Sequence, residues 1–162
     1  MNPLIIKQTA ILSAILGGII GVLTLIPFIR GFTFMLLILC ISTVIIVYMK
    51  KNDLIGIIDV REGAMLGGII GFVSFIAFSI VFIPLVSLTG LIFKGYYTYG
   101  ILQMLKAGLG GILVLIMIII FLALVISALM NAFAGLVTAY VYEILSGIKK
   151  EENKSVDFEI KE

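Results

Sequence analysis

The chain has 162 residues, of which 62% are hydrophobic and only 12% charged, and its mean hydropathy is +1.32. A soluble globular domain is closer to half apolar and a quarter charged, so this composition excludes a soluble domain, a disordered chain and a nucleic-acid-binding module. The absence of histidine also excludes a Ser-His-Asp or Cys-His nucleophile and a histidine-ligated metal site. A small polytopic membrane protein remains.

Charged residues cluster at a few places and leave four charge-free runs, at 8–29, 31–49, 63–93 and 107–142. Each run is at least 19 residues long, close to the ~20 that a helix needs to cross a ~30 Å hydrocarbon core. The runs are too long for barrel strands and do not alternate, so helices are favoured. The sequence predicts an all-α, polytopic integral membrane protein. The four transmembrane helices are expected at about 9–29, 32–49, 63–88 and 112–146.

The second and third runs carry local signals. Cys40 is the only cysteine, and we expect it to be a small packing residue in the middle of the second helix. Asp59, followed three residues later by Glu62, is typical of a helix start with a capping box. Pro84 lacks a backbone donor, which predicts a kink or an end in the third helix.

The fourth run is long enough to leave two alternatives open. As one helix it extends about 54 Å, well beyond the thickness of the hydrocarbon core. We favour one long helix that begins with a protruding or hinged segment around Gly108. The alternative is a pair of antiparallel helices that turns at 108–111 or 131–135. The transmembrane domain is expected to cover 1–148, and 149–162 to form a charged, disordered cytoplasmic tail or a docking peptide.

The basic residues set the orientation. Four crossings place both ends of the chain on one side of the membrane, and that side receives eight of the 11 lysines and arginines. The other side receives only Arg30, Lys94 and Lys106. The positive-inside rule therefore predicts that both termini are cytoplasmic. All six tyrosines lie near expected helix ends, as interfacial aromatic residues do.

A short segment occurs twice at an offset of 50. Residues 14–21 and 64–71 are identical at seven of eight positions, and both copies begin helices that leave the cytoplasm. We interpret them as a parallel two-plus-two repeat. Small residues recur every four positions in these copies and in the fourth helix, which lets helices approach closely in lipid. The predicted helix-packing residues are Ser13, Gly17, Gly21, Gly63, Gly67, Gly71, Ser127, Asn131 and Gly135.

The polar residues expected at membrane depth are few. No ionisable side chain occurs within the expected helices before Glu143, which argues against a proton-coupled carrier or a voltage sensor. Deep serines and threonines are expected to bond to carbonyls of their own helix. Asn131 should seek a partner on another helix, and we favour a structural role over a substrate contact.

Two functional hypotheses follow. The leading one is a non-enzymatic membrane protein that acts through helix–helix association as a scaffold, accessory subunit or regulator. Its partners are the lipid bilayer and a second copy or another membrane protein, with no nucleic acid, cofactor or metal. The alternative is a channel or carrier for a small neutral or apolar solute, lined by Asn131, Ser127, Ser74 and Thr24.

The pattern resembles a group of uncharacterised prokaryotic four-span membrane proteins that carry a domain of unknown function. The resemblance lies in a glycine-rich first helix closed by Ile-Pro at 17–27, a short second helix, Glu-Gly-Ala-Met-Leu-Gly at 62–67 and a small-residue-rich last helix at 131–135. It implies a multi-pass protein of a prokaryotic inner or plasma membrane and brings no activity or functional residues. The long fourth run departs from this pattern.

Overall fold

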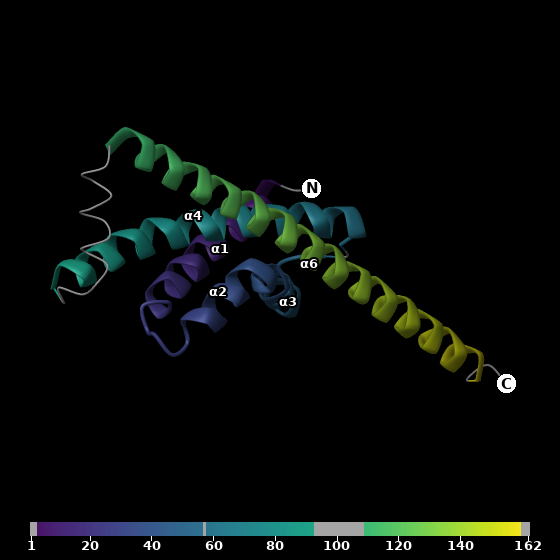
Figure 1. Cartoon of the computed structure of the whole chain (residues 1–162). Helices are drawn as coiled ribbons and strands as arrows, with labels where there is room; N and C mark the ends of the chain where they lie inside the picture. The colour runs from purple at the N-terminus through teal and green to yellow at the C-terminus, as the bar shows by residue number, and fades with distance from the viewer. Residues whose placement is uncertain (1–2, 57, 93–108, 160–162) are drawn as a thin grey trace.

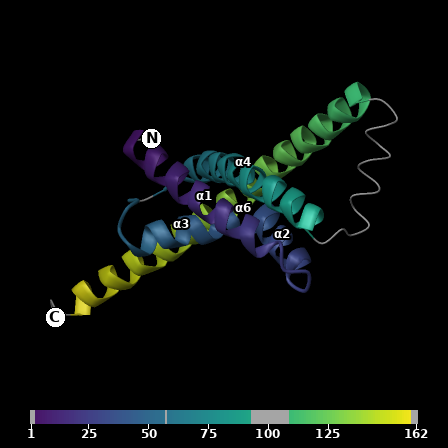
Figure 2. The ribbon, with the colours of Figure 1, turned by 90° about the vertical axis from the view of Figure 1, so that its left-hand side faces the viewer.

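The computed structural model describes residues 3–56, 58–92 and 109–159, and all regular structure in these ranges is helical. The helices, in chain order, are α1 (Pro3–Leu23), α2 (Arg30–Leu39), α3 (Ile41–Lys51), α4 (Val60–Ile92) and α6 (Leu109–Glu159). The long helices α1, α4 and α6 cross near the centre of the molecule, and α2 and α3 lie beside them (Figures 1 and 2).

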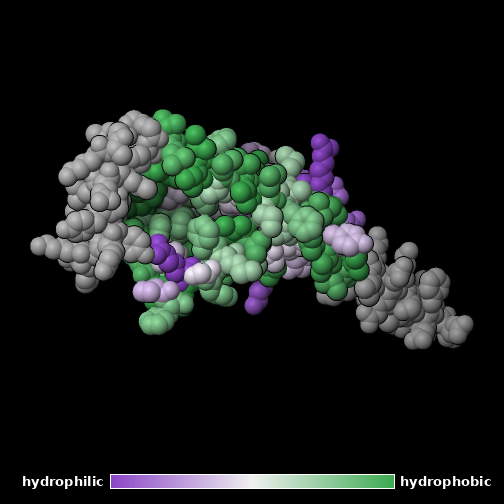
Figure 3. Space-filling view, in the orientation of Figure 1, coloured by the Kyte–Doolittle hydropathy of each residue, from purple (hydrophilic) through white to green (hydrophobic). Residues whose placement is uncertain are grey.

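The helices have the lengths and surfaces of membrane helices. Three of those in the described ranges, α1, α4 and α6, are long and apolar enough to cross a membrane, and α2 with α3 forms a fourth if the bent pair is one span. The face in Figure 3 is mostly hydrophobic, with hydrophilic residues in a few patches. Large exposed apolar side chains occur on every long helix, among them Ile15, Ile80 and Phe133. Lipid accepts such side chains without a partner. The all-helical class predicted from composition is confirmed for the described residues, with three helices that are candidates for membrane spans.

Helix α1 runs parallel to α4. Gly17 lies directly against the backbone of Ser74, and four residues later Gly21 lies against Phe78. Because both numbers rise together along the contact, the two helices point in the same direction. This is the relation expected for two helices that leave the same side of a membrane.

Helix α6 runs antiparallel to α4. Gly63 lies against Ala139, and eight residues later Gly71 lies against Ser127. As the residue number rises on α4 it falls on α6, so α6 returns in the opposite direction. The contact involves the first third of α4 and the middle of α6, so α6 extends past the other helices toward its C-terminal end (Figures 1 and 2).

The second expected helix, 32–49, is broken in the structure. α2 and α3 meet at Cys40 with a bend of 66°. Cys40 is exposed at this bend, so its expected packing role is wrong. The pair nevertheless follows the length of α1. Near one end of α1, Thr33 Oγ1 lies 2.9 Å from Thr24 Oγ1. Near the other end, Met49 Sδ lies 3.3 Å from Thr9 Oγ1.

Helix α4 begins where the sequence predicts. The carboxylate of Asp59 accepts a hydrogen bond from the backbone N–H of Val60, and its carbonyl accepts one from Gly63. Asp59 thus provides the first carbonyl of the helix, as an N-terminal cap does. Of the two outcomes expected at Pro84, a kink or an end, the end is wrong, since α4 continues through it to Ile92.

Helix α6 is continuous from Leu109 to Glu159. The alternative of two antiparallel helices over 107–142 is therefore wrong within the described residues. The expectation of a disordered tail is also wrong for 149–159, whose backbone continues α6. Several features named from the sequence, including Lys94, Lys106, Gly108 and the tyrosines at 96, 97 and 99, lie outside the described residues.

Candidate functional site

The two Gly-Gly pairs place their first members in the closest approach to a neighbouring helix. An added Cβ at Gly17 or Gly67 would overlap a backbone carbonyl oxygen, that of Ser74 or of Asn131 respectively. The next residue, Gly18, has space, since the nearest atom to an added Cβ is 3.7 Å away. The first glycine of each copy therefore permits the close approach of two backbones, which a side chain would prevent.

All nine sequence-predicted packing residues are buried between helices of this chain. Gly21, Gly63, Gly71 and Gly135 each meet atoms of another helix within ordinary contact distance or closer. Ser13 is fully buried, and its hydroxyl donates to the Thr9 carbonyl at 2.6 Å. These surfaces are occupied within one molecule. The second helices of the two repeat copies differ, because α2–α3 is broken whereas α6 is continuous.

Asn131 is the centre of the polar contacts. It is fully buried on α6, and its side-chain amide reaches the break between α2 and α3. Its Nδ2 donates to the carbonyls of Leu37 and Ile38, each at 3.0 Å, while its Oδ1 accepts the backbone N–H of Ser42 at 3.0 Å. In an unbroken helix the N–H of Ser42 would bond directly to the carbonyl of Ile38. The amide of Asn131 is inserted into that hydrogen bond.

This insertion gives the bend a physical cause. Helices bend sharply at proline, at small-residue pairs, or where a side chain enters the hydrogen-bond ladder. Residues 37–42 contain neither proline nor glycine, and the Asn131 amide lies between the N–H of Ser42 and the carbonyl of Ile38, so the third cause applies. In lipid the freed backbone groups need a partner, which neighbouring helices supply. Asn131 supplies it here. Its Nδ2 also lies 2.9 Å from the Ser127 carbonyl, so one of its two N–H groups is shared between two of the three carbonyl oxygens.

One polar atom beside this site has no partner. Ser42 is fully buried, and its Oγ is the single buried side-chain nitrogen or oxygen without a hydrogen bond in the described part of the chain. The deep hydroxyls of Thr9, Thr24 and Ser79 bond to carbonyls of their own helix, as expected from the sequence. Ser42 departs from that expectation because its own helix begins only one residue earlier.

The four residues proposed from the sequence as a solute lining do not form one site. Ser127 Oγ donates to the carbonyl of Gly71 at 3.2 Å, and Ser74 Oγ reaches the same oxygen at 3.3 Å. Together with Asn131, these two serines form a connected set between α4 and α6. Thr24 is separate, because it bonds to Ile20 and Thr33 near the end of α1. All four side chains are nearly inaccessible.

An open groove lies next to the break, between α3 and α6. Its volume is about 550 Å³. Its lining is mostly apolar and comprises Leu39, Thr43, Val47, Phe133, Ala134, Val137, Thr138, Val141, Tyr142 and Leu145. The hydroxyls of Thr43 and Thr138 lie 3.1 Å apart and connect the two helices along it. Neither the sequence periodicity nor the packing stripes indicated this groove, since it depends on the direction that α3 takes after the bend.

Aromatic side chains pack at the opposite end of the bundle. Phe78 stacks on Phe82 with centroids 4.9 Å apart, and Phe34 and Phe75 lie 6.0 Å from Phe78. The guanidinium of Arg30 lies 5.5 Å from the centroid of Phe82, within the range of a cation–π contact. These contacts fix the start of α2 against α4.

Within the described residues, no group of three or more histidine, cysteine, aspartate or glutamate side chains could hold a metal ion. No family model, curated protein or solved structure matches the chain. The candidate site is therefore the Asn131-bridged break and the groove beside it, on geometry alone.

Proposed function

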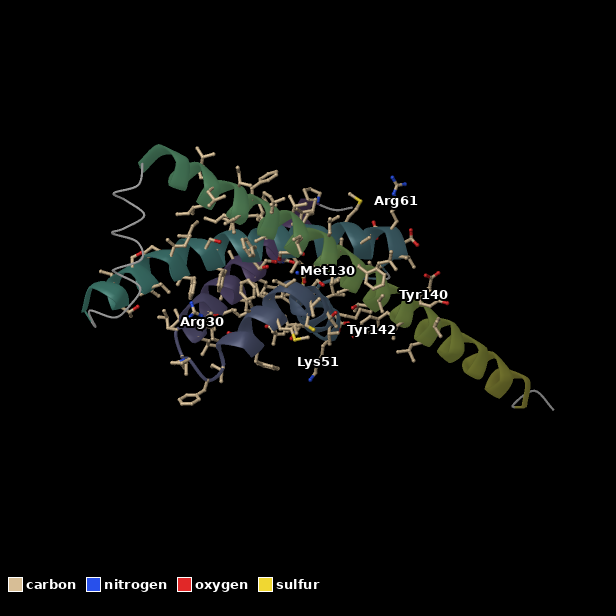
Figure 4. The ribbon with its side chains drawn as sticks, viewed as in Figure 1. Arg30, Lys51, Arg61, Met130, Tyr140 and Tyr142 are labelled. Atoms are coloured by element: carbon tan, nitrogen blue, oxygen red, sulfur yellow. The ribbon has the colours of Figure 1, made fainter. Side chains whose placement is uncertain are left out.

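We propose that this chain is a multi-pass protein of a prokaryotic plasma membrane that crosses the bilayer four times, with both termini in the cytoplasm. The parallel contact of α1 with α4 supports this topology, because the chain must return between them. The bent pair α2–α3 follows α1 from the level of Thr24 to the level of Thr9 and provides the return. Figure 4 shows Arg30 toward one end of the bundle and Arg61 toward the other. In this proposal the positive-inside rule makes the end with Arg61 the cytoplasmic one.

Its function is non-enzymatic and consists in association with other membrane helices, as a scaffold, accessory subunit or regulator. The observation that supports it is the exposure of α6. In the 18-residue apolar stretch that represents α6, only 11% of the residues are buried inside the molecule, whereas the corresponding stretches of α1 and α4 are each 28% buried. The glycine surfaces hold the bundle together, and most of the described side chains of α6, at 114–145, are exposed. A second copy or another membrane protein is the partner.

Cysteine cross-linking in native membranes tests this function. Cys40 is replaced by serine, and single cysteines are placed at Leu129 on α6 and at Ile15 on α1, which are 64% and 54% exposed. We expect a discrete adduct, with a second copy or with one other protein, from Leu129→Cys and none from Ile15→Cys. The absence of an adduct at both positions, with a monomer in native mass spectrometry, would contradict association by α6.

A carrier or channel for a small neutral solute is the second candidate, favoured by the break itself. Discontinuous membrane helices form the substrate sites of many transporters, and the Ser42 hydroxyl beside Asn131 is unused. Flux into vesicles that contain the purified protein distinguishes this candidate. Transport of a neutral solute that is lost in Ser42→Ala would support it, and no flux above that of protein-free vesicles for any tested solute would exclude it.

A further inference from the structure

We infer that the groove between α3 and α6 binds one anionic phospholipid of the cytoplasmic leaflet, with an acyl chain along the groove and the headgroup at Lys51. This inference goes beyond association by α6. It requires only that the C-terminal end of α3 faces the cytoplasmic surface, and the labelling experiment that closes the Discussion tests that requirement separately.

The shape and lining of the groove suit a hydrocarbon chain. It holds about 550 Å³, within the usual range of ligand pockets, and is open along one side toward the exposed surface. Its two threonine hydroxyls, on Thr43 and Thr138, lie 3.1 Å apart and thus face each other. The remaining lining is aliphatic or aromatic, apart from the phenol of Tyr142. An aliphatic chain matches this surface, whereas a polar solute would leave its own donors and acceptors unpaired.

The direction of the groove follows from the residue numbers. It begins near Leu39 at the break and ends near Val47 on α3 and Leu145 on α6. The two helices run in the same direction along it. A chain that lies in the groove therefore extends from the bend toward the C-terminal end of α3, where the proposed topology places the cytoplasmic headgroups.

Lys51 and Tyr142 place a cation and a hydroxyl at the C-terminal end of α3. Thr43, Val47 and Lys51 are spaced by four residues, so Lys51 lies on the groove-facing side of α3, one turn beyond Val47. Lys51 is exposed, whereas the neighbouring Lys50 Nζ donates to the carbonyl of Gly56 at 2.8 Å. Figure 4 shows Lys51 and Tyr142 on the same side of the molecule.

The charge decides the class of lipid. Basic side chains beside a groove between membrane helices, on the cytoplasmic side, recognise anionic headgroups. A zwitterionic lipid offers the same acyl chain but no net charge to Lys51. The site should therefore prefer phosphatidylglycerol to phosphatidylethanolamine by about fivefold, the order expected from one lysine at an anionic surface.

Tryptophan quenching by brominated lipids measures this preference, because the chain contains no tryptophan of its own. Val141→Trp reports from the groove, and Val125→Trp reports from α6 outside the lining; the native valines are 48% and 38% exposed. Each full-length variant is placed in phosphatidylcholine vesicles with either phosphatidylglycerol or phosphatidylethanolamine brominated on the same acyl carbons. The ratio of the two quenching efficiencies is independent of the depth of the reporter.

We expect stronger quenching by the glycerol lipid at Val141→Trp and a ratio near one at Val125→Trp. Adding Lys51→Gln to Val141→Trp should bring the ratio to about one, and Lys7→Gln, an exposed lysine on α1, should leave it unchanged. Equal ratios at the two reporters would overturn a specific site in the groove. A preference that survives Lys51→Gln would overturn the headgroup assignment.

Native mass spectrometry gives a second measurement on the unlabelled chain. After extraction from vesicles with equal amounts of both lipids, the wild type should retain one phosphatidylglycerol molecule. Lys51→Gln, which removes the cation but leaves the groove open, should retain much less of it, while Val125→Trp behaves as the wild type. Equal retention by all three would overturn the proposal, and circular dichroism of each variant verifies that it is folded.

Discussion

At the scale of single residues, the close approach of backbones depends on which glycine of each pair faces the neighbouring helix. Gly17 and Gly67 occupy the same position in the two copies of the repeated segment, and each meets a carbonyl oxygen of the adjacent helix. Gly18 and Gly68 have the same chemistry and sequence context but meet nothing closer than 3.7 Å. The pairs therefore provide internal controls for the effect of a single methyl group.

Alanine substitutions should separate the two members of each pair. Gly17→Ala and Gly67→Ala force the helices apart, and overpacking of this kind costs about 1–3 kcal/mol. Gly18→Ala and Gly68→Ala avoid the overlap and should be neutral or stabilising by up to about 1 kcal/mol, because alanine favours the helix. Unfolding in mixed micelles with increasing sodium dodecyl sulfate, followed by circular dichroism, gives the differences. Equal effects within a pair would contradict the packing described.

Much of this residue-scale picture could be predicted from the sequence. The four-residue spacing of Ser13, Gly17 and Gly21 is a local pattern, and it identifies a face of α1 without knowledge of its neighbour. The partner of that face could not be predicted, because Ser74 and Phe78 are more than 50 residues away. Likewise, the sequence identified Asn131 as a residue that needs a partner on another helix, but not which one.

At the scale of elements, the break between α2 and α3 is a property of two helices together. Leu37, Ile38 and Ser42 provide three of the backbone groups that the bend releases, and Asn131 of α6 binds these three. The local segment is a run of aliphatic residues around Cys40 that predicts a straight helix. The bend is maintained by a side chain some 90 positions away, so no local signal for it exists. Pro84 is the opposite case. Proline is a strong local signal for the end of a helix, and yet α4 continues through it.

Replacing Asn131 by leucine should therefore change the shape of α2–α3. Without the amide, the N–H of Ser42 can return to the carbonyl of Ile38, which straightens the pair, or remain unpaired at about 1–3 kcal/mol for each buried group. Spin labels at Met35 and Val44, both exposed, flank the bend in a Cys40→Ser background. We expect the distance between the labels in Asn131→Leu to shift toward that of a straight helix. In a straight helix, Cα atoms nine residues apart are separated by about 13–14 Å. We also expect the variant to unfold more easily.

Thr138→Val is the control for this experiment. It removes one hydroxyl contact between α6 and α3, and a single interhelical hydrogen bond in a membrane protein contributes about 0.6 kcal/mol on average. We expect a small loss of stability and no change in the distance between the labels. An unchanged distance and unchanged stability in Asn131→Leu would show that the bend has another cause.

At the scale of the whole molecule, α4 connects the other helices. It contacts α1 in parallel and α6 in antiparallel orientation, and its start is level with the start of α1. If α2–α3 were a re-entrant loop, the chain would emerge after α3 on the side where α1 ends. α4 would then have to begin on that side, opposite to its observed direction along α1. The bent pair as a complete crossing removes this conflict.

The sidedness of two exposed glycines tests the complete topology. Gly31 lies at the start of α2 and Gly56 lies between α3 and α4; both are exposed, and an added Cβ at either position meets nothing within 4 Å. In a Cys40→Ser background, Gly31→Cys should react in intact cells with a membrane-impermeant maleimide, because the proposed topology places it at the outer surface. Gly56→Cys should react only after the cells are permeabilised, because the proposed topology places it in a cytoplasmic loop. Reaction of both cysteines from the same side would show that α2–α3 does not cross the membrane. Reaction of Gly56→Cys alone in intact cells would show that the orientation is the reverse of the one derived from the lysines and arginines.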